Sequence, residues 1–256
     1  MNGHLESKKE PGVNSTRRIA VVAGVFFIVA AAAAIAGLGL EGPVLTDPGY
    51  IVAGSGNDLR VILGAFLEVI LAISVIGTAV TLFPIVKRQN EGIALGYVAG
   101  RVVEGVVIVV GIISLLSVVR LRQEFAEGTG ADAASLVAVG KSLVAIHDWT
   151  FLFGPSLAIG VNTLLLAYLM YRSGLVPRVI AVVGLIGGPV IFAAGTAELF
   201  GLFQQISVWG SIAAIPVFAW EMSLAVWMIV KGFKPSPIRS GDMALSSPSP
   251  LRGVGV

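Results

Sequence analysis

Six long apolar runs, each bounded by polar residues, glycine or proline, divide the chain. They cover residues 19–40, 59–86, 93–119, 142–171, 179–200 and 208–230. A helix needs about 20 apolar residues to cross a hydrocarbon core of roughly 30 Å, and every run reaches that length. The pattern therefore predicts an all-α fold, a polytopic transmembrane helical bundle with six spanning helices, as one domain over residues 19–231.

The composition indicates that a bilayer is the main solvent of this chain. Of the 256 residues, 56% are hydrophobic and only 12% are charged, and the mean hydropathy is +0.92. The net charge is +2, but the basic residues flank the apolar runs instead of gathering with aromatic residues in a patch. The sequence thus predicts the lipid bilayer as a partner and no nucleic acid, and it leaves the ligand and the oligomeric state open.

Positive charges distinguish the two sides of the predicted bundle, because cytoplasmic loops retain an excess of Lys and Arg. The more basic side holds Lys8, Lys9, Arg17, Arg18, Lys87, Arg88, Arg172, Arg178, Lys231, Lys234, Arg239 and Arg252. The other side holds Arg60, Arg120, Arg122 and Lys141. We therefore expect a protein of the cell (cytoplasmic) membrane with both termini cytoplasmic, a polar leader over residues 1–18 and a disordered tail over residues 232–256.

The first apolar run has a competing interpretation as a cleaved signal peptide. Basic residues precede it, and its alanine pairs resemble a cleavage site. The run is longer than a usual signal core, however, and its removal would leave an odd number of spans. A spanning helix is therefore the favoured interpretation.

Four ionisable side chains fall well inside the apolar runs: Glu68, Arg101, Glu104 and Glu221. A charge at the bilayer centre costs about 2.5–3.5 kcal/mol on insertion scales, so such residues are a functional hypothesis by default. Arg101 and Glu104 share a helix face, and the guanidinium fork can hold a second carboxylate, for which Glu221 is the preferred candidate. The four residues either bind a ligand or protons or only clamp the helices together.

A second polar group is predicted near the outer ends of the fourth and fifth runs. Asp148, Pro155 and Asn162 follow a seven-residue spacing, His147 precedes Asp148, and Glu198 lies near the end of the fifth run. These side chains suit an outward vestibule, a proton relay or a carboxylate-rich metal site. His147 is the only histidine within a run, which disfavours a metal site and a haem held by two histidines.

No catalytic set or cofactor motif is present in the sequence. Ser156 lies about two and a half turns from His147 on one predicted helix, which is too far for the histidine to act as its base. The chain has no cysteine for thiolate metal sites, and no phosphate-binding loop, HExxH or dinucleotide fingerprint. Catalytic, cofactor-binding and metal-ligating residues are therefore not assigned.

Small residues at helical spacing mark faces on which membrane helices approach closely. One such stripe lies in the third run and another in the fifth, and both are expected to face other helices. The stripes are Gly100, Glu104, Val107, Gly111 and Ser114, and Gly184, Gly188, Ile191, Gly195 and Glu198.

Four short motifs carry a resemblance to a known family. They are Arg101-Val-Val-Glu104, His147-Asp148-Trp149, Arg172-Ser-Gly-Leu-Val-Pro-Arg178 and Trp220-Glu221. With the apolar sequence around them, from about Thr16 to Lys234, they resemble the bacterial six-span membrane proteins grouped as domain of unknown function 4386. The resemblance implies a single integral membrane domain and no particular activity.

Three classes of function fit these observations. The first is a small-molecule or proton-linked binding or transport bundle that uses Glu68, Arg101, Glu104 and Glu221. The second is a structural or accessory membrane protein whose buried charges only fix the helices. The third is an intramembrane enzyme that modifies a lipid from the outer side with His147, Asp148 and Glu198.

Overall fold

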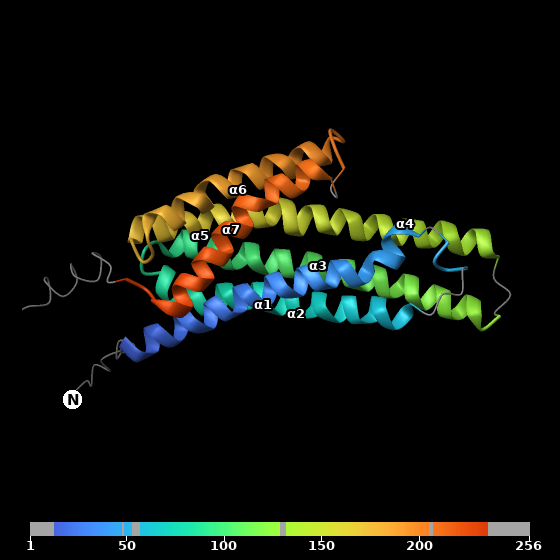
Figure 1. Ribbon diagram of the computed structural model, residues 1–256, viewed down its shortest axis with the longest axis horizontal. Coiled ribbons are helices and arrows are strands. Elements are labelled where there is room, and N and C mark those ends of the chain that lie inside the picture. The colour runs from blue at the N-terminus through green and yellow to red at the C-terminus, as the bar shows by residue number, and fades with distance from the viewer. Residues whose placement is uncertain (1–12, 48, 53–56, 129–131, 205–206, 235–256) are drawn as a thin grey trace, which may run out of the picture.

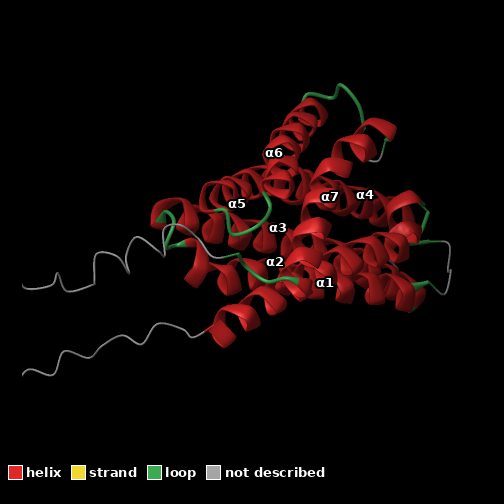
Figure 2. Cartoon of the chain, turned by 60° about the vertical axis from the view of Figure 1, so that its left-hand side comes forward, coloured by secondary structure: helices red, strands yellow, loops and turns green. Residues whose placement is uncertain are grey.

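The computed structural model describes residues 13–47, 49–52, 57–128, 132–204 and 207–234, and all regular elements in these residues are helices (Figure 1, Figure 2). The predicted all-α fold is therefore confirmed. The residues of the polar leader before 13 and of the tail after 234 lie outside the described part. The helices are α1 (Val13–Thr46), α2 (Asp58–Val86), α3 (Glu91–Ala126), α4 (Ala133–Phe151), the π-helix η1 (Leu152–Ala158), α5 (Ile159–Ser173), α6 (Arg178–Leu199) and α7 (Val208–Val230).

Six helical segments are long and apolar enough to cross a membrane, as the sequence predicts. The fourth of them combines α4, η1 and α5 into one segment, Ala133–Ser173, of 41 residues. Several helices are longer than their apolar runs, since α3 continues to Ala126 and α4 already begins at Ala133. Hydropathy marks only the part of a helix that lies in hydrocarbon, whereas backbone hydrogen bonding continues into the polar residues beyond it.

The start of α1 and the end of α7 lie side by side at one end of the bundle (Figure 1). The guanidinium group of Arg17 donates to the carbonyl oxygens of Met228 at 2.9 Å and of Ile229 at 2.5 Å. These carbonyls belong to the last turn of α7, where a cation also offsets the negative end of the helix dipole. The same end holds the α5–α6 turn, because the amide of Lys234 donates to the carbonyl of Leu175 at 2.8 Å.

Proline shapes the fourth span. Pro155 lies inside η1, where the helix widens to π-type hydrogen bonding. Proline has no amide hydrogen, and its ring collides with the carbonyl of the preceding turn in a regular α-helix. A single wide turn relieves this clash without ending the helix, and such turns are frequent at functional sites.

Small residues let α6 pack closely against α5 and α7. This agrees with the stripe of small residues predicted in the fifth run. Gly184 of α6 faces the indole of the fully buried Trp220 in α7 and the methyl group of Ala167 in α5. Gly188 of α6 faces the backbone of Gly160 in α5. Because lipid tails are as apolar as the helices, such van der Waals packing is a main source of helix association.

We expect Gly184→Ala to reduce the free energy of unfolding by about 1–3 kcal/mol, the usual cost of overpacking. A Cβ atom at this position would lie 2.6 Å from a ring carbon of Trp220 and 2.8 Å from Cβ of Ala167. Gly39→Ala is the matched control, because nothing lies within 4 Å of a Cβ atom there. Denaturant unfolding of the detergent-solubilised protein compares the two variants, and equal stability of both would contradict this packing.

Candidate functional site

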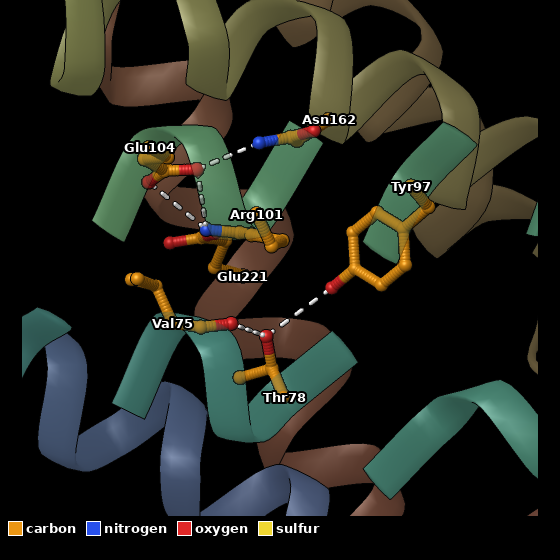
Figure 3. Close-up of polar contacts among 7 residues, drawn as sticks. All are labelled: Val75, Thr78, Tyr97, Arg101, Glu104, Asn162 and Glu221. Atoms are coloured by element: carbon orange, nitrogen blue, oxygen red, sulfur yellow. Dashed lines mark hydrogen bonds and ion pairs between the residues drawn. The ribbon is translucent and has the colours of Figure 1, made fainter. Parts of the chain in front are cut away.

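Arg101 lies at the centre of a buried ion-pair network between α3 and α7 (Figure 3). Its Nη1 atom is 3.2 Å from Oε1 of Glu104, one turn along the same helix, and its Nη2 atom is 2.8 Å from Oε1 of Glu221 in α7. The side chains of Arg101 and Glu104 are almost fully buried, and that of Glu221 is 13% exposed. The predicted pairing of Arg101 with both carboxylates is confirmed.

Asn162 of α5 completes this network, which we name the arginine cluster: Arg101, Glu104, Asn162 and Glu221. The amide nitrogen of Asn162 donates to Oε2 of Glu104 at 2.7 Å (Figure 3). Gly100 provides the space for this contact, because a Cβ atom on it would collide with the amide oxygen of Asn162. Asn162 was predicted to continue a polar line from Asp148, but the structure directs it to Glu104 instead.

Aromatic rings enclose the guanidinium group of Arg101. Its Cζ atom lies 5.7 Å from the ring centroids of both Phe27 in α1 and Tyr97 in α3, within cation–π range. The hydroxyl of Tyr97 is 3.3 Å from that of Thr78 in α2, so the second span also reaches the edge of the cluster (Figure 3). The arginine cluster and its aromatic neighbours thus involve α1, α2, α3, α5 and α7.

Glu68 does not belong to the arginine cluster, which corrects the prediction of one central group of four charges. The part of α2 beside the cluster is Val75 to Thr78 (Figure 3). Glu68 precedes Val75 by seven residues, which is about 10 Å along a helix axis. The run boundaries already contain this offset, because Glu68 lies 18 residues before the end of its run at residue 86, whereas Glu104 lies 11 residues after the start of its run at residue 93.

Glu68 lies instead in a second buried group with Glu41 of α1 and His147 of α4, which we name the histidine cluster. The Nε2 atom of His147 is 3.9 Å from Oε2 of Glu41 and 3.9 Å from Oε1 of Glu68. These separations exceed hydrogen-bonding distance. Both carboxylate oxygens of Glu41, whose side chain is 0% exposed, and Oε2 of Glu68 have no hydrogen-bond partner among the described residues. Three polar side chains therefore converge without satisfying one another.

Close contact between α1 and α2 makes room for Glu41. A Cβ atom on Gly64 of α2 would lie 2.7 Å from Cγ of Glu41 and 3.2 Å from the carbonyl oxygen of Gly37 in α1. Only glycine fits at position 64 unless the Glu41 side chain moves. The sequence thus builds a specific space for a buried carboxylate between two helices.

A pocket of about 230 Å³ adjoins the histidine cluster. Glu68 and His147 contribute its ionisable groups, and most of the remaining wall is apolar. The other lining residues are Ala34, Ile35, Leu38, Leu71, Ile108, Gly111, Thr150, Phe151 and Pro155. No member of the arginine cluster lines this pocket. An unpaired carboxylate and an imidazole thus face an apolar space large enough for a small ligand.

Glu41 lies just outside the first predicted run, which ends at Leu40, before Gly42 and Pro43. In the structure α1 continues through Pro43 to Thr46. A signal was present in the sequence, since the small residues Ala30, Ala33 and Gly37 recur at helical spacing before Glu41. The structure buries all four positions.

The outer group predicted from His147, Asp148 and Glu198 does not form as such. Asp148 is 62% exposed, with its Oδ1 atom 3.7 Å from Nδ1 of His147. No ion pair or hydrogen bond within the described part of the chain joins Glu198 to either residue, and its Oε2 atom has no partner there. His147 points its other ring nitrogen toward Glu41 and Glu68 instead, so the predicted vestibule is replaced by the histidine cluster.

A third polar group ties the α1–α2 connection to α3. Asp58 accepts hydrogen bonds from Nε of Arg122 at 2.5 Å and from the hydroxyl of Tyr50 at 2.7 Å. Burial of Tyr50, together with this bond to Asp58, raises the pKa of Tyr50 to about 12. Asp58 and Arg122 are 64 residues apart, so no local spacing could reveal the pair.

These features define the class of protein as an all-α membrane protein with six spanning segments and two buried polar clusters. The family model with the description Domain of unknown function (DUF4386) matches residues 22–232, and the chain belongs to this family. The resemblance drawn from the four motifs is thereby confirmed. Comparisons with curated proteins and with solved structures gave no significant match.

We expect Arg101→Met to lower the free energy of unfolding by about 3–5 kcal/mol, because it leaves two buried carboxylates without their cation. Arg120→Met is the matched control, since Arg120 pairs with Glu124 on an exposed helix surface, where such pairs contribute about 0–1 kcal/mol. Adding Glu104→Gln and Glu221→Gln to Arg101→Met should recover part of the loss. Similar losses for Arg101→Met and Arg120→Met in denaturant unfolding would contradict the clamp.

Proposed function

We propose that this protein is a membrane-embedded binding protein for a small cation, with the histidine cluster and its pocket as the binding site. The arginine cluster serves as the internal clamp that fixes the helices around this site. The proposal retains the predicted ligand-binding class but moves the site from Arg101 to Glu41, Glu68 and His147.

The observation that carries the proposal is that three carboxylate oxygens of the histidine cluster have no hydrogen-bond partner among the described residues. Glu41 and Glu68 each lie 3.9 Å from the imidazole of His147, but within the described residues no hydrogen bond reaches either side-chain oxygen of Glu41 or Oε2 of Glu68. Two carboxylates in apolar surroundings repel each other and lack the solvation that water would give. A bound cation relieves both costs, whereas an anion would add to them.

In the arginine cluster Nε of Arg101 and Oδ1 of Asn162 have no hydrogen-bond partner among the described residues, but the charged groups contact one another directly. Arg101 already donates to Glu104 and Glu221, and Asn162 occupies another oxygen of Glu104. A ligand would have to displace charge-assisted hydrogen bonds, which are the strongest kind in proteins. Stabilisation is therefore the role that fits these residues.

Binding at the histidine cluster also provides a link to protons. Carboxylate and imidazole groups take up protons as well as cations, and histidine changes its charge near physiological pH. A cation and protons therefore compete for the same three side chains. This competition is the proton-linked part of the proposed function.

We further infer that both termini face the cytoplasm. Lys and Arg are concentrated on the side that holds the start of α1 and the end of α7, and the opposite side has few. Positive residues near the ends of spans are retained on the cytoplasmic side.

Orientation can be measured directly because the chain contains no cysteine. In intact cells, we expect Glu127→Cys at the end of α3 to react with a membrane-impermeant maleimide. Arg88→Cys in the α2–α3 turn should react only after the membrane is permeabilised. The reverse pattern would overturn the proposed orientation without affecting the binding site.

Carboxyl-specific labelling tests the site without knowledge of its ligand. We expect dicyclohexylcarbodiimide, an apolar reagent, to modify Glu68, which faces the pocket, in preference to Glu104 and Glu221, which Arg101 holds. Phenethylammonium, an apolar body with one cationic end, should protect Glu68 in a concentration-dependent way. Mass spectrometry of the labelled protein identifies the modified residue.

Two variants serve as controls for this labelling. Glu68→Gln should abolish the adduct, whereas Glu198→Gln removes an unpaired carboxylate in α6 and should leave the adduct unchanged. Modification of Glu104 or Glu221 with Glu68 left intact would overturn the proposed site. The arginine cluster would then be the leading candidate for the binding site.

A further inference from the structure

We propose that Glu41, Glu68 and His147 form a binding site for a divalent first-row transition metal ion such as Zn²⁺. This inference rests on the proposed function and specifies the class of cation. It changes the sequence prediction, in which no metal-ligating residue was assigned.

The spacing of the three side chains suits one metal ion. One ligand atom from each residue lies within 4.8 Å of the other two, and both His147 to carboxylate separations are 3.9 Å. Tetrahedral coordination with metal–ligand bonds of about 2.0–2.1 Å requires ligand atoms roughly 3.3 Å apart. Both pairs that include His147 therefore have to close by roughly half an ångström around the ion, and the two carboxylate oxygens, which lie within 4.8 Å of each other, by at most about 1.5 Å.

The donor set narrows the choice of ion. Imidazole nitrogen suits Zn²⁺ and other transition metals, and carboxylates complete such sites. Ca²⁺ takes six to eight oxygen ligands, and Mg²⁺ retains several waters in an octahedral shell, so neither matches one nitrogen and two carboxylates in a small space. The absence of cysteine leaves nitrogen and oxygen as the ligand atoms.

Burial provides an independent reason to expect a ligand here. The side chain of Glu41 is fully buried, lies against Gly64 and has two oxygens with no hydrogen-bond partner among the described residues. Buried polar groups are almost always satisfied, so an unsatisfied carboxylate needs an explanation. A divalent ion would balance the two negative charges of Glu41 and Glu68 and coordinate the oxygens that now lack partners.

The pocket gives the site an open coordination position. Glu68 and His147 line it, whereas Glu41 is fully buried and is not part of the wall. Three protein ligands with a fourth position left for water or another small ligand are typical of exchangeable metal centres, unlike closed structural sites. Asp148 lies 3.7 Å from Nδ1 of His147, on the ring edge where metal-bound histidines commonly meet a carboxylate.

Metal binding can be measured on the full-length protein in detergent after removal of metals with EDTA. Titration with Co²⁺ should give visible d–d absorption of a four-coordinate nitrogen and oxygen site at one ion per chain, and Zn²⁺ should displace it. Glu41→Gln, Glu68→Gln and His147→Gln should each weaken Co²⁺ binding by at least about tenfold, the smallest loss usual even for outer partners of metal ligands.

Matched controls separate this site from adventitious binding. Glu198→Gln removes a carboxylate elsewhere, and His4→Gln removes the other of the two histidines, which lies outside the described residues. Both variants should retain the affinity of the unchanged protein. If His4→Gln or Glu198→Gln abolishes Co²⁺ binding while the three cluster variants retain it, the proposed metal site is wrong.

A measurement on the unchanged protein covers the case in which a cluster variant fails to fold. X-ray absorption of the Zn²⁺-loaded protein should show one imidazole and otherwise oxygen ligands in the first shell. A first shell without imidazole would overturn the proposal. The result does not depend on any substitution.

The outcome also separates this inference from the proposed function. If neither Co²⁺ nor Zn²⁺ binds but phenethylammonium still protects Glu68 from carbodiimide, the metal inference fails and cation binding stands. If Glu68 is neither labelled nor protected and no metal binds, both fail. One-to-one Co²⁺ binding that depends on all three side chains supports both.

Discussion

The pairing of Arg101 with Glu104 and Glu221 is the interaction on which the arrangement of the bundle depends. A guanidinium group inside an apolar protein is tolerated when carboxylates balance its charge. α3 supplies one carboxylate itself, but α7 has to supply the other, and α5 has to bring Asn162 to Glu104. The chain order separates these helices widely, so the requirement of one buried cation fixes their lateral positions.

The same pairing determines which acids remain for function. Because Arg101 is engaged by Glu104 and Glu221, it contributes nothing to Glu41 and Glu68, which meet only His147. The buried charges thus fall into two groups with opposite properties. In the arginine cluster the guanidinium group donates hydrogen bonds to both carboxylates, whereas in the histidine cluster both carboxylates lie 3.9 Å from the imidazole, and Glu68 and His147 line a pocket.

Backbone packing makes room for both groups. Glycine lets helices approach closely where a polar side chain must fit between them, as Gly64 does for Glu41 and Gly100 for Asn162. The wide turn at Pro155 lies between His147 and Asn162 in the fourth span, and Pro155 also lines the pocket. One helix therefore contributes to both clusters, His147 before the wide turn and Asn162 after it.

The sequence by itself determined the class of fold, because hydrocarbon leaves a chain with long apolar runs few alternatives to spanning helices. It also determined the pair Arg101 and Glu104, since a spacing of three residues places them on one helix face. Only the tertiary structure decided that Glu68 joins Glu41 and His147, and that Asn162 joins Glu104. These partners lie on different helices, whose rotation and relative height are set by side-chain packing across the bundle. The residue pattern within one apolar run therefore does not show which residues of other helices these side chains contact.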